Sequence, residues 1–159
     1  MSTVVAAIIQ RGGRILICRR SAAQAHALKW EFPGGKVEGD ESPPQALSRE
    51  LQEELAVRAR IGDEVERYEF CYPGKSAILL IFYAVTELAG EPRNCVFEEM
   101  RWVAPGELPQ FDFLEGDVEF VKRLLIAAAA RPCSARDSTV RSTGGPPATA
   151  TPGCGRCPR

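Results

Sequence analysis

The sequence predicts an α/β/α sandwich with a mixed β-sheet, formed by a single domain over residues 1–130. Strand-like runs, bounded by turn residues, occur at 4–10, 14–18, 57–72, 76–86 and 100–103. Helical patterns lie between the two strand pairs and at the end of the domain, at 43–55 and 118–130. Helices placed among strand pairs in this order can cover both faces of one sheet.

Glycine-containing turns join the strands within each pair. Gly12 and Gly13 follow the first run, and two glycines suit a tight hairpin because glycine readily adopts a positive φ. Pro73 and Gly74 divide the second pair in the same way. We therefore expect two strand pairs, with the helix at 43–55 between them.

The helix at 43–55 has a well-specified start and an apolar face. Ser42 precedes Pro43, and Gln45 follows the serine by three residues, which is the pattern of a capping box with proline at the first helical position. Leucines repeat at a spacing of four, at positions 47, 51 and 55. This stripe is expected to pack on the sheet.

Three glutamates, Glu50, Glu53 and Glu54, share another stripe of this helix, because positions three and four apart are neighbours on its surface. Their like charges repel, and within the helix no lysine or arginine follows three or four residues later to offset them. Carboxylate oxygens are the ligands that Mg²⁺ prefers, and Mg²⁺ usually keeps positions for water and substrate phosphates. The stripe favours metal-assisted chemistry on a phosphate, and a solvated acidic face is the alternative.

The segment from Gly35 to Val57 resembles the Nudix box, G-x5-E-x7-R-E-U-x-E-E-x-G-U, in which U is a bulky aliphatic residue. The matching positions are Gly35, Glu41, Arg49, Glu50, Leu51, Glu53, Glu54 and Val57. Ala56 departs from the pattern, at a position where glycine would serve as a left-handed helix cap. The resemblance implies the Nudix fold and a hydrolase that uses Mg²⁺, or Mn²⁺ in its place.

A wider resemblance, over about residues 3–128, is to the MutT-like members of this family, which include 8-oxo-dGTP diphosphatases and CTP pyrophosphohydrolases. It is carried by the segment 19–36, by Gly90-Glu91-Pro92, by Trp102 and by the helix after Asp117. It implies hydrolysis of a nucleoside triphosphate to the monophosphate and pyrophosphate, a form of nucleotide-pool sanitation. The substrates 8-oxo-dGTP and (d)CTP compete for first place, with ADP-ribose and dinucleoside polyphosphates below them.

The resemblance also implies roles for single residues. The Gly34 carbonyl, Glu50, Glu53 and Glu54 would hold the metal, which lowers the pKa of an attacking water. Arg49 would orient Glu41 or a neighbouring glutamate by a forked ion pair. The expected substrate-binding residues are Arg20, Phe32, Lys36 and Asp117. Among them, Asp117 lies where relatives contact the base edge, and Arg20 and Lys36 are either phosphate contacts or solvated cations.

Two further features of the expected site stay open. A family glutamate that serves as metal ligand or base falls on Val96, so Glu98, or Glu99 in an irregular loop, would substitute for it, or the helix acids suffice. Aromatic residues at three positions could stack on a base or belong to the core: Phe70, Phe111 and Phe113.

Charge divides the chain, with a net −5 over residues 1–130 and +4 over residues 131–159. The second segment consists largely of Pro, Gly, Ser, Thr and Arg, which cannot bury enough surface to offset chain entropy. We interpret it as a disordered, solvated tail, with contact to an acidic surface or nucleic acid as the alternative. The acidic body disfavours a stable nucleic-acid complex, so the expected partner is a small nucleotide.

Cysteine usage and hydropathy indicate a cytoplasmic location without membrane association. Cys18, Cys71 and Cys95 lie in apolar runs and are expected to stay reduced as small hydrophobic residues. Cys154 and Cys157 have redox or zinc spacing but lack a second pair of ligands. No signal peptide and no apolar stretch near ~18 residues is apparent.

A non-catalytic Nudix module, which senses a nucleotide or recognises oxidised guanine beside a repair domain, is the second hypothesis. Such modules tend to lose acids of the box or to be fused to a partner domain. Because this chain keeps Glu50, Glu53 and Glu54 and has no room for a second domain, the sequence favours the enzyme.

Overall fold

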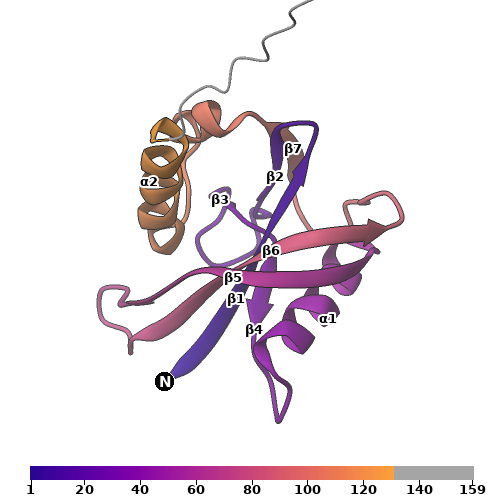
Figure 1. The fold of residues 1–159 in the computed structure, drawn as a ribbon. Coiled ribbons are helices and arrows are strands. Elements are labelled where there is room, and N and C mark those ends of the chain that lie inside the picture. The colour runs from indigo at the N-terminus through magenta and orange to yellow at the C-terminus, as the bar shows by residue number, and fades with distance from the viewer. Residues whose placement is uncertain (131–159) are drawn as a thin grey trace, which may run out of the picture.

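The fold, described for residues 1–130 by a computed structural model, is the expected α/β/α sandwich with a mixed sheet (Figure 1). The expected tail at 131–159, with Cys154 and Cys157, lies outside the described residues. The strands are β1 (Ser2–Arg11), β2 (Arg14–Arg19), β3 (Trp30–Glu31), β4 (Gly34–Lys36), β5 (Arg58–Phe70), β6 (Ile78–Ala89) and β7 (Glu99–Val103). The helices are α1 (Pro43–Leu55), α2 (Glu115–Ala129) and the 3-10 helix η1 (Pro105–Gln110).

The sheet is mixed because its central strand, β1, has neighbours in both directions. The strand order is β3-β2-β1-β6-β5, with β4 also paired to β1 and β7 to β2. β1 runs parallel to β6, with Val5 opposite Ile81, and antiparallel to β2 and β4. The expected β1–β2 hairpin is present, and β5 pairs with β6 around the loop at 71–77.

One helix packs on each face of the sheet, and a separate hydrophobic core lies between each helix and the sheet. Val5, Ala7 and Ile9 of β1 face α1, and the alternate residues Ala6 and Ile8 face α2, as the two-residue period of a strand requires. The α1 core includes the predicted leucine stripe, in which Leu47, Leu51 and Leu55 are fully buried. Figure 1 shows the two helices on opposite sides of the sheet.

Two short strands that form the floor of the site escaped the sequence analysis. β3 and β4 lie in a segment that reads as a loop, and β4 contains Gly34 and Gly35, which have low strand propensity. Their conformation comes from pairing, since Gly34, Gly35 and Lys36 lie opposite Ala6, Val5 and Val4 of β1. Pairing with a distant strand leaves no local sequence signal.

Element boundaries shift by a few residues from the expected ones. α2 begins at Glu115 rather than 118, with Glu115 and Asp117 in its first turn, where acids complement the helix dipole. β6 extends to Ala89, three residues beyond the expected end. In residues 1–130, no helix combines the length and hydrophobicity that crossing a membrane needs.

The cysteine prediction is correct in one part and wrong in another. Cys18, Cys71 and Cys95 are all unpaired, and Cys18 is buried, as expected. Cys71 and Cys95 are exposed rather than packed as small hydrophobic residues. Each lies in a connecting loop, directly after β5 and before β7 respectively, where the adjacent apolar residues no longer line a core.

Candidate active site

Both ends of α1 are fixed, which sets the direction of its acidic stripe. At the start, the Gln45 Oε1 atom accepts hydrogen bonds from the Ser42 N–H and hydroxyl, each at 2.8 Å. At the end, Ala56 adopts the left-handed conformation expected of the family glycine, with φ 55°, and its N–H donates to the Gln52 carbonyl at 3.1 Å. Helix α1 is therefore a rigid support for the side chains that it carries.

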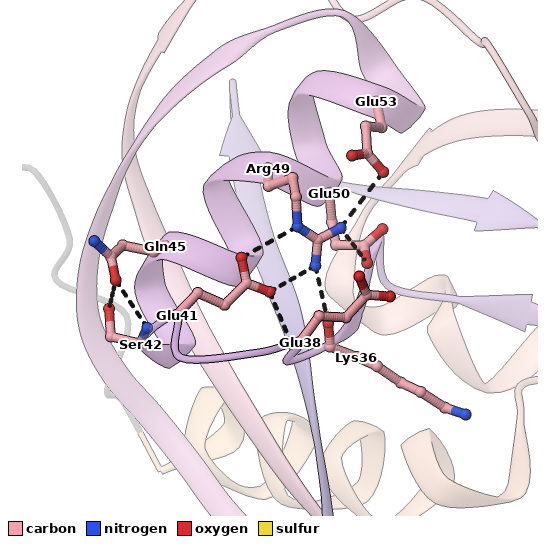
Figure 2. Close-up of polar contacts among 8 residues, drawn as sticks. All are labelled: Lys36, Glu38, Glu41, Ser42, Gln45, Arg49, Glu50 and Glu53. Atoms are coloured by element: carbon pink, nitrogen blue, oxygen red, sulfur yellow. Dashed lines mark hydrogen bonds and ion pairs between the residues drawn. The ribbon is translucent and has the colours of Figure 1, made fainter.

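Arg49 is the centre of a polar network beside the acidic stripe (Figure 2). Its guanidinium forms the expected forked ion pair with Glu41, at 2.7 and 3.2 Å, and donates to the Lys36 carbonyl at 3.0 Å. It also contacts Glu50 at 3.0 Å and Glu53 at 3.5 Å. Although no cation follows the stripe within the helix, Arg49 offsets part of its charge from a position four residues before Glu53 and one before Glu50.

Glu50 and Glu54 lie against the glycines of β4. The Gly34 N–H donates to the Glu54 Oε2 atom at 3.0 Å. A Cβ atom added to Gly35 would lie 2.2 Å from the Glu50 Oε1 atom, so a larger residue would displace that carboxylate. The first glycine of the box is thus required by the close approach of the helix acid to the strand backbone.

The surroundings of these two carboxyl groups disfavour their ionised forms. Burial, followed by repulsion from Glu31 and Glu50, raises the pKa of Glu54 to about 8. Burial also raises the pKa of Glu50, although Arg49 opposes the change. A cation placed between the helix and β4 would favour the ionised form of both groups.

The donor chemistry of Glu50 and Glu54 fits a hard divalent cation, since both groups offer carboxylate oxygens from a rigid helix. Within residues 1–130, however, no three acidic, histidine or cysteine side chains gather closely enough to enclose a metal as they stand. Glu53 is exposed and turned toward Arg49, so it could join a metal only by changing rotamer. The expected role of the Gly34 carbonyl stays a prediction.

A cavity of about 370 Å³ begins at the same glycines. Gly34, Gly35 and Lys36 line one side of it, and Asp117 from α2 lines another. Further polar or aromatic lining residues come from the loop at 20–29, from β3 and from the β5–β6 loop: Arg20, His26, Glu31, Phe32, Tyr72 and Lys75. The cavity and the acidic face of α1 therefore meet at β4, although no residue of that helix lines the cavity itself.

Asp117 is buried, with 6% of its surface exposed, and its Oδ2 atom accepts a hydrogen bond from the Phe32 N–H at 3.2 Å. Burial and the nearby charge of Glu31 raise the pKa of Asp117 to about 8. At neutral pH the carboxyl group is therefore largely protonated and offers both a donor and an acceptor. Such a pair can hydrogen-bond the edge of a nucleobase that presents adjacent acceptor and donor groups.

Arg20 lines the cavity, but its guanidinium is already hydrogen-bonded to other protein groups. Its Nη1 atom contacts both carboxylate oxygens of Glu31, at 3.0 and 2.8 Å, and its Nε donates to the Ala25 carbonyl at 2.8 Å. The sequence analysis missed Glu31, although a glutamate between Trp30 and Phe32 in an apolar run signals a buried, paired charge. His26, Tyr72 and Lys75 were missed as well, because they lie in loops without a local motif.

The predicted aromatic residues lie mainly in the core, and Glu98 lies on the surface. Phe32 lines the cavity but is mainly core, stacking on Phe113 with ring centroids 5.3 Å apart. Phe111 packs against Trp30 with ring centroids 5.1 Å apart, so Phe111 and Phe113 both belong to the core. Tyr72 joins Phe32 as an aromatic residue of the cavity wall. Glu98 is exposed before β7, with its N–H donating to the Arg19 carbonyl at 2.9 Å, and its catalytic role stays a prediction.

Comparison with known proteins agrees with this geometry. The NUDIX domain family matches residues 1–124. The chain is 39% identical over 132 residues to the CTP pyrophosphohydrolase of Escherichia coli K12, covering 83% of this chain and 97% of that protein. It is 40% identical over 123 residues to the 8-oxo-dGTP diphosphatase of Haemophilus influenzae, covering 77% and 90%.

Solved structures show the same relationship. The solution structure of the E. coli ORF135 protein has a TM-score of 0.73 at 38% identity, covering 84% of this chain and 94% of that one. A MutT Nudix hydrolase from Burkholderia pseudomallei has a TM-score of 0.69 at 26% identity, covering 76% and 95%. The chain belongs to the Nudix family and is a MutT-like Nudix hydrolase. Members of this family act on small nucleotides and generally use a divalent metal.

Proposed function

We propose that the chain hydrolyses a nucleoside triphosphate to the nucleoside monophosphate and pyrophosphate in a reaction that requires Mg²⁺. The observation that carries the proposal is the position of β4 between the two halves of the site. Gly34 and Gly35 contact the carboxylates of Glu54 and Glu50 and also line the cavity. A nucleotide in that cavity would have its phosphates beside the acids and its base toward Asp117.

At the phosphate end, Glu50 and Glu54 would hold Mg²⁺, with Glu53 and the Gly34 carbonyl as further ligands. The bound ion would neutralise phosphate charge and lower the pKa of the attacking water. Arg49 keeps Glu41 and Glu50 in fixed orientations through its forked contacts. Lys36 and Lys75 are cationic residues of the cavity wall that can contact phosphate oxygens.

At the base end, we propose that Asp117 hydrogen-bonds the base edge and that Tyr72 contacts its face. The protonated carboxyl of Asp117 matches the adjacent N3 acceptor and N4 amine of cytosine, and it also matches the O6 and N1–H of a guanine-type base. This chemistry is consistent with (d)CTP and 8-oxo-dGTP as leading substrates. The relatives named for CTP and 8-oxo-dGTP hydrolysis support the same pair. We further propose that the reaction occurs in the cytoplasm.

A product assay tests the proposal. Purified protein would be incubated with CTP, dCTP, dGTP, 8-oxo-dGTP and ADP-ribose, and monophosphate, pyrophosphate and orthophosphate would be separated and measured. We expect pyrophosphate as the phosphorus product, full loss of turnover in EDTA, and recovery on adding Mg²⁺ or Mn²⁺. Nucleotide binding without turnover under every metal condition would support the non-catalytic module instead.

The role of Glu98 has its own test. If Glu98 supplies the ligand or base that Val96 cannot, then Glu98→Gln will lower kcat, because the amide accepts no proton and binds Mg²⁺ weakly. Glu99→Gln tests the alternative candidate, which lies in strand β7 with its carboxylate paired to Arg101. Unchanged turnover in both variants would remove these residues from the site and leave the helix acids to suffice.

A further inference from the structure

We propose that Tyr68 is a positioning residue for base recognition, whose hydroxyl fixes the first turn of α2 and thereby the place of Asp117 in the cavity. The inference rests on the proposed contact between Asp117 and the base. Tyr68 does not line the cavity, so it would act only through the backbone that carries Asp117.

The hydroxyl of Tyr68 bonds to two backbone groups on either side of Asp117. It donates to the Gly116 carbonyl at 2.6 Å and accepts from the Phe120 N–H at 3.2 Å. These groups are four residues apart, the spacing of partners in one helical turn. A single side chain from β5 therefore holds both ends of the turn that presents Asp117.

The start of α2 has no side-chain cap. The residue before α2 is Leu114, which makes no side-chain hydrogen bond to the first helical N–H groups. The Leu114 carbonyl accepts the Asp117 N–H at 2.9 Å. Further contacts to this turn come from other segments of the fold: Tyr68 bonds to its backbone, and the Phe32 N–H donates to the Asp117 carboxyl at 3.2 Å.

Tyr68 itself is held in place by packing. Its ring stacks on Phe82 with centroids 5.7 Å apart, and Phe82 stacks on Phe120 of α2 at 4.2 Å. The Arg123 guanidinium lies 5.1 Å from the Tyr68 ring centroid. These contacts restrict the rotamer of Tyr68, so its hydroxyl stays in one position and holds the turn there.

The other side of the turn has little free space. A Cβ atom on Gly116 would lie 3.1 Å from Leu80 and 3.2 Å from the Tyr72 hydroxyl. Leu80 and Tyr72 both line the cavity. A shift of Gly116 would therefore change the relation between the Asp117 carboxyl and the cavity wall, which is the geometry that selects a base.

Tyr68→Phe tests the inference because it removes the hydroxyl and keeps the ring. We would measure kcat and KM for CTP and 8-oxo-dGTP, with Tyr83→Phe as the matched control. Tyr83 is a tyrosine of β6 that packs in the α1 core, away from the cavity. We define discrimination as the kcat/KM for the better of the two substrates divided by the kcat/KM for the other. We expect Tyr68→Phe to reduce this ratio by about threefold to tenfold, which is the size of one hydrogen bond. The change should arise in KM, with kcat within about twofold of the parent.

Coupling to Asp117 separates positioning from general stability. In an Asp117→Ala background, Tyr68→Phe should cause no further loss of discrimination. An equal loss in that background, or an unchanged ratio in the single variant, would overturn the inference. If Asp117→Ala itself keeps full discrimination, the proposed base contact is wrong and the inference falls with it. Should Tyr68→Phe fail to fold, Gly116→Ala displaces the same turn, because the added Cβ atom would lie 3.1 Å from Leu80. The ratio should then shift through KM, and an unchanged ratio would overturn the inference.

Discussion

The phosphate end and the base end of the cavity are built in opposite ways. At the phosphate end, the four groups proposed as metal ligands lie between Gly34 and Glu54, and one helix carries three of them. At the base end, Asp117, Glu31 and Tyr72 come from α2, β3 and the β5–β6 loop. The first end is specified by local sequence, and the second exists only after distant segments have packed.

The two ends also manage charge differently. Around Arg49, three glutamates share one guanidinium at a partly exposed surface, where water screens the remaining charge. At the base end, burial raises the pKa of Asp117 to about 8, so that group is neutral rather than paired. Glu54 is intermediate between the exposed ion pairs and the buried Asp117, because it is half-buried and accepts one hydrogen bond from a backbone N–H. A metal at the phosphate end would complete the charge balance that the base end achieves by keeping a proton.

The largest effect should come from Glu54→Gln. The substitution keeps the shape of the side chain but removes the charge that would bind Mg²⁺. We expect kcat to fall by about 10²–10³-fold, as when one preorganised electrostatic group is lost. Initial rates measured over a range of Mg²⁺ concentrations check this, with Glu119→Gln as a control on the exposed face of α2. A native rate in Glu54→Gln combined with Glu53→Gln would refute metal binding by this helix.

The next effect should come from Arg49. Arg49→Lys keeps a positive charge but cannot reproduce the fork that holds Glu41 while contacting Glu50. We expect a fall in kcat/KM of about 10- to 100-fold, typical for groups that orient metal ligands. If Arg49→Lys matches the parent and Arg49→Ala alone loses activity, net charge rather than orientation is the function of this residue.

These two ends show what sequence reasoning can and cannot reach. The leucine stripe, the capping residues and the acids of α1 follow from periodicity within 13 residues, and the structure confirms the helix from Pro43 to Leu55. The left-handed conformation of Ala56 agrees with the family pattern, in which glycine at this position would serve as a left-handed helix cap. Local patterns determine these features before any tertiary contact forms.

Sequence reasoning predicted less of the pocket. Apart from the glycines of β4, only Asp117, Arg20, Phe32 and Lys36 of its wall were expected, and all four were implied by the family resemblance. Glu31 is paired across the 20–29 loop, and β4 is a strand only because β1 lies beside it. No periodicity marks a residue whose environment is made by other segments, as Asp117 and Phe32 show at 85 positions apart, so the pocket required the structure.

Asp117→Asn is expected to change the pH dependence of stability. Because the folded-state pKa of Asp117 is about 8 and its ordinary value is 3.8, the folded protein keeps a proton that the unfolded chain has lost between these values. The free energy of unfolding therefore falls as pH rises through that window. The asparagine variant lacks this term and should gain at least about 1 kcal/mol on the parent between pH 5 and 8, since one pKa unit is about 1.4 kcal/mol.

Urea unfolding of both proteins at pH 5, 6, 7 and 8 measures this difference. Some slope should remain in the variant, because burial also raises the pKa of Glu31 and Glu54 in the folded state. Parallel curves for the two proteins would mean that Asp117 is ionised when folded. The base end would then resemble the charged phosphate end, and the contrast between them would disappear.

The smallest effect should come from the end of α1, where the chain departs from the family pattern. Ala56 has φ 55°, a conformation that is about 1–2 kcal/mol less favourable for a residue with a Cβ atom, whereas glycine adopts it freely. Glycine also loses more chain entropy on folding, so Ala56→Gly should raise the free energy of unfolding by only about 0.5–1 kcal/mol, measured by urea unfolding. Ala127→Gly, in the exposed interior of α2, should lower it by a similar amount because glycine disfavours a right-handed helix. Equal losses in both variants would show that the left-handed turn after α1 is held by its packing and not by residue 56, which would make the phosphate end as dependent on distant contacts as the base end.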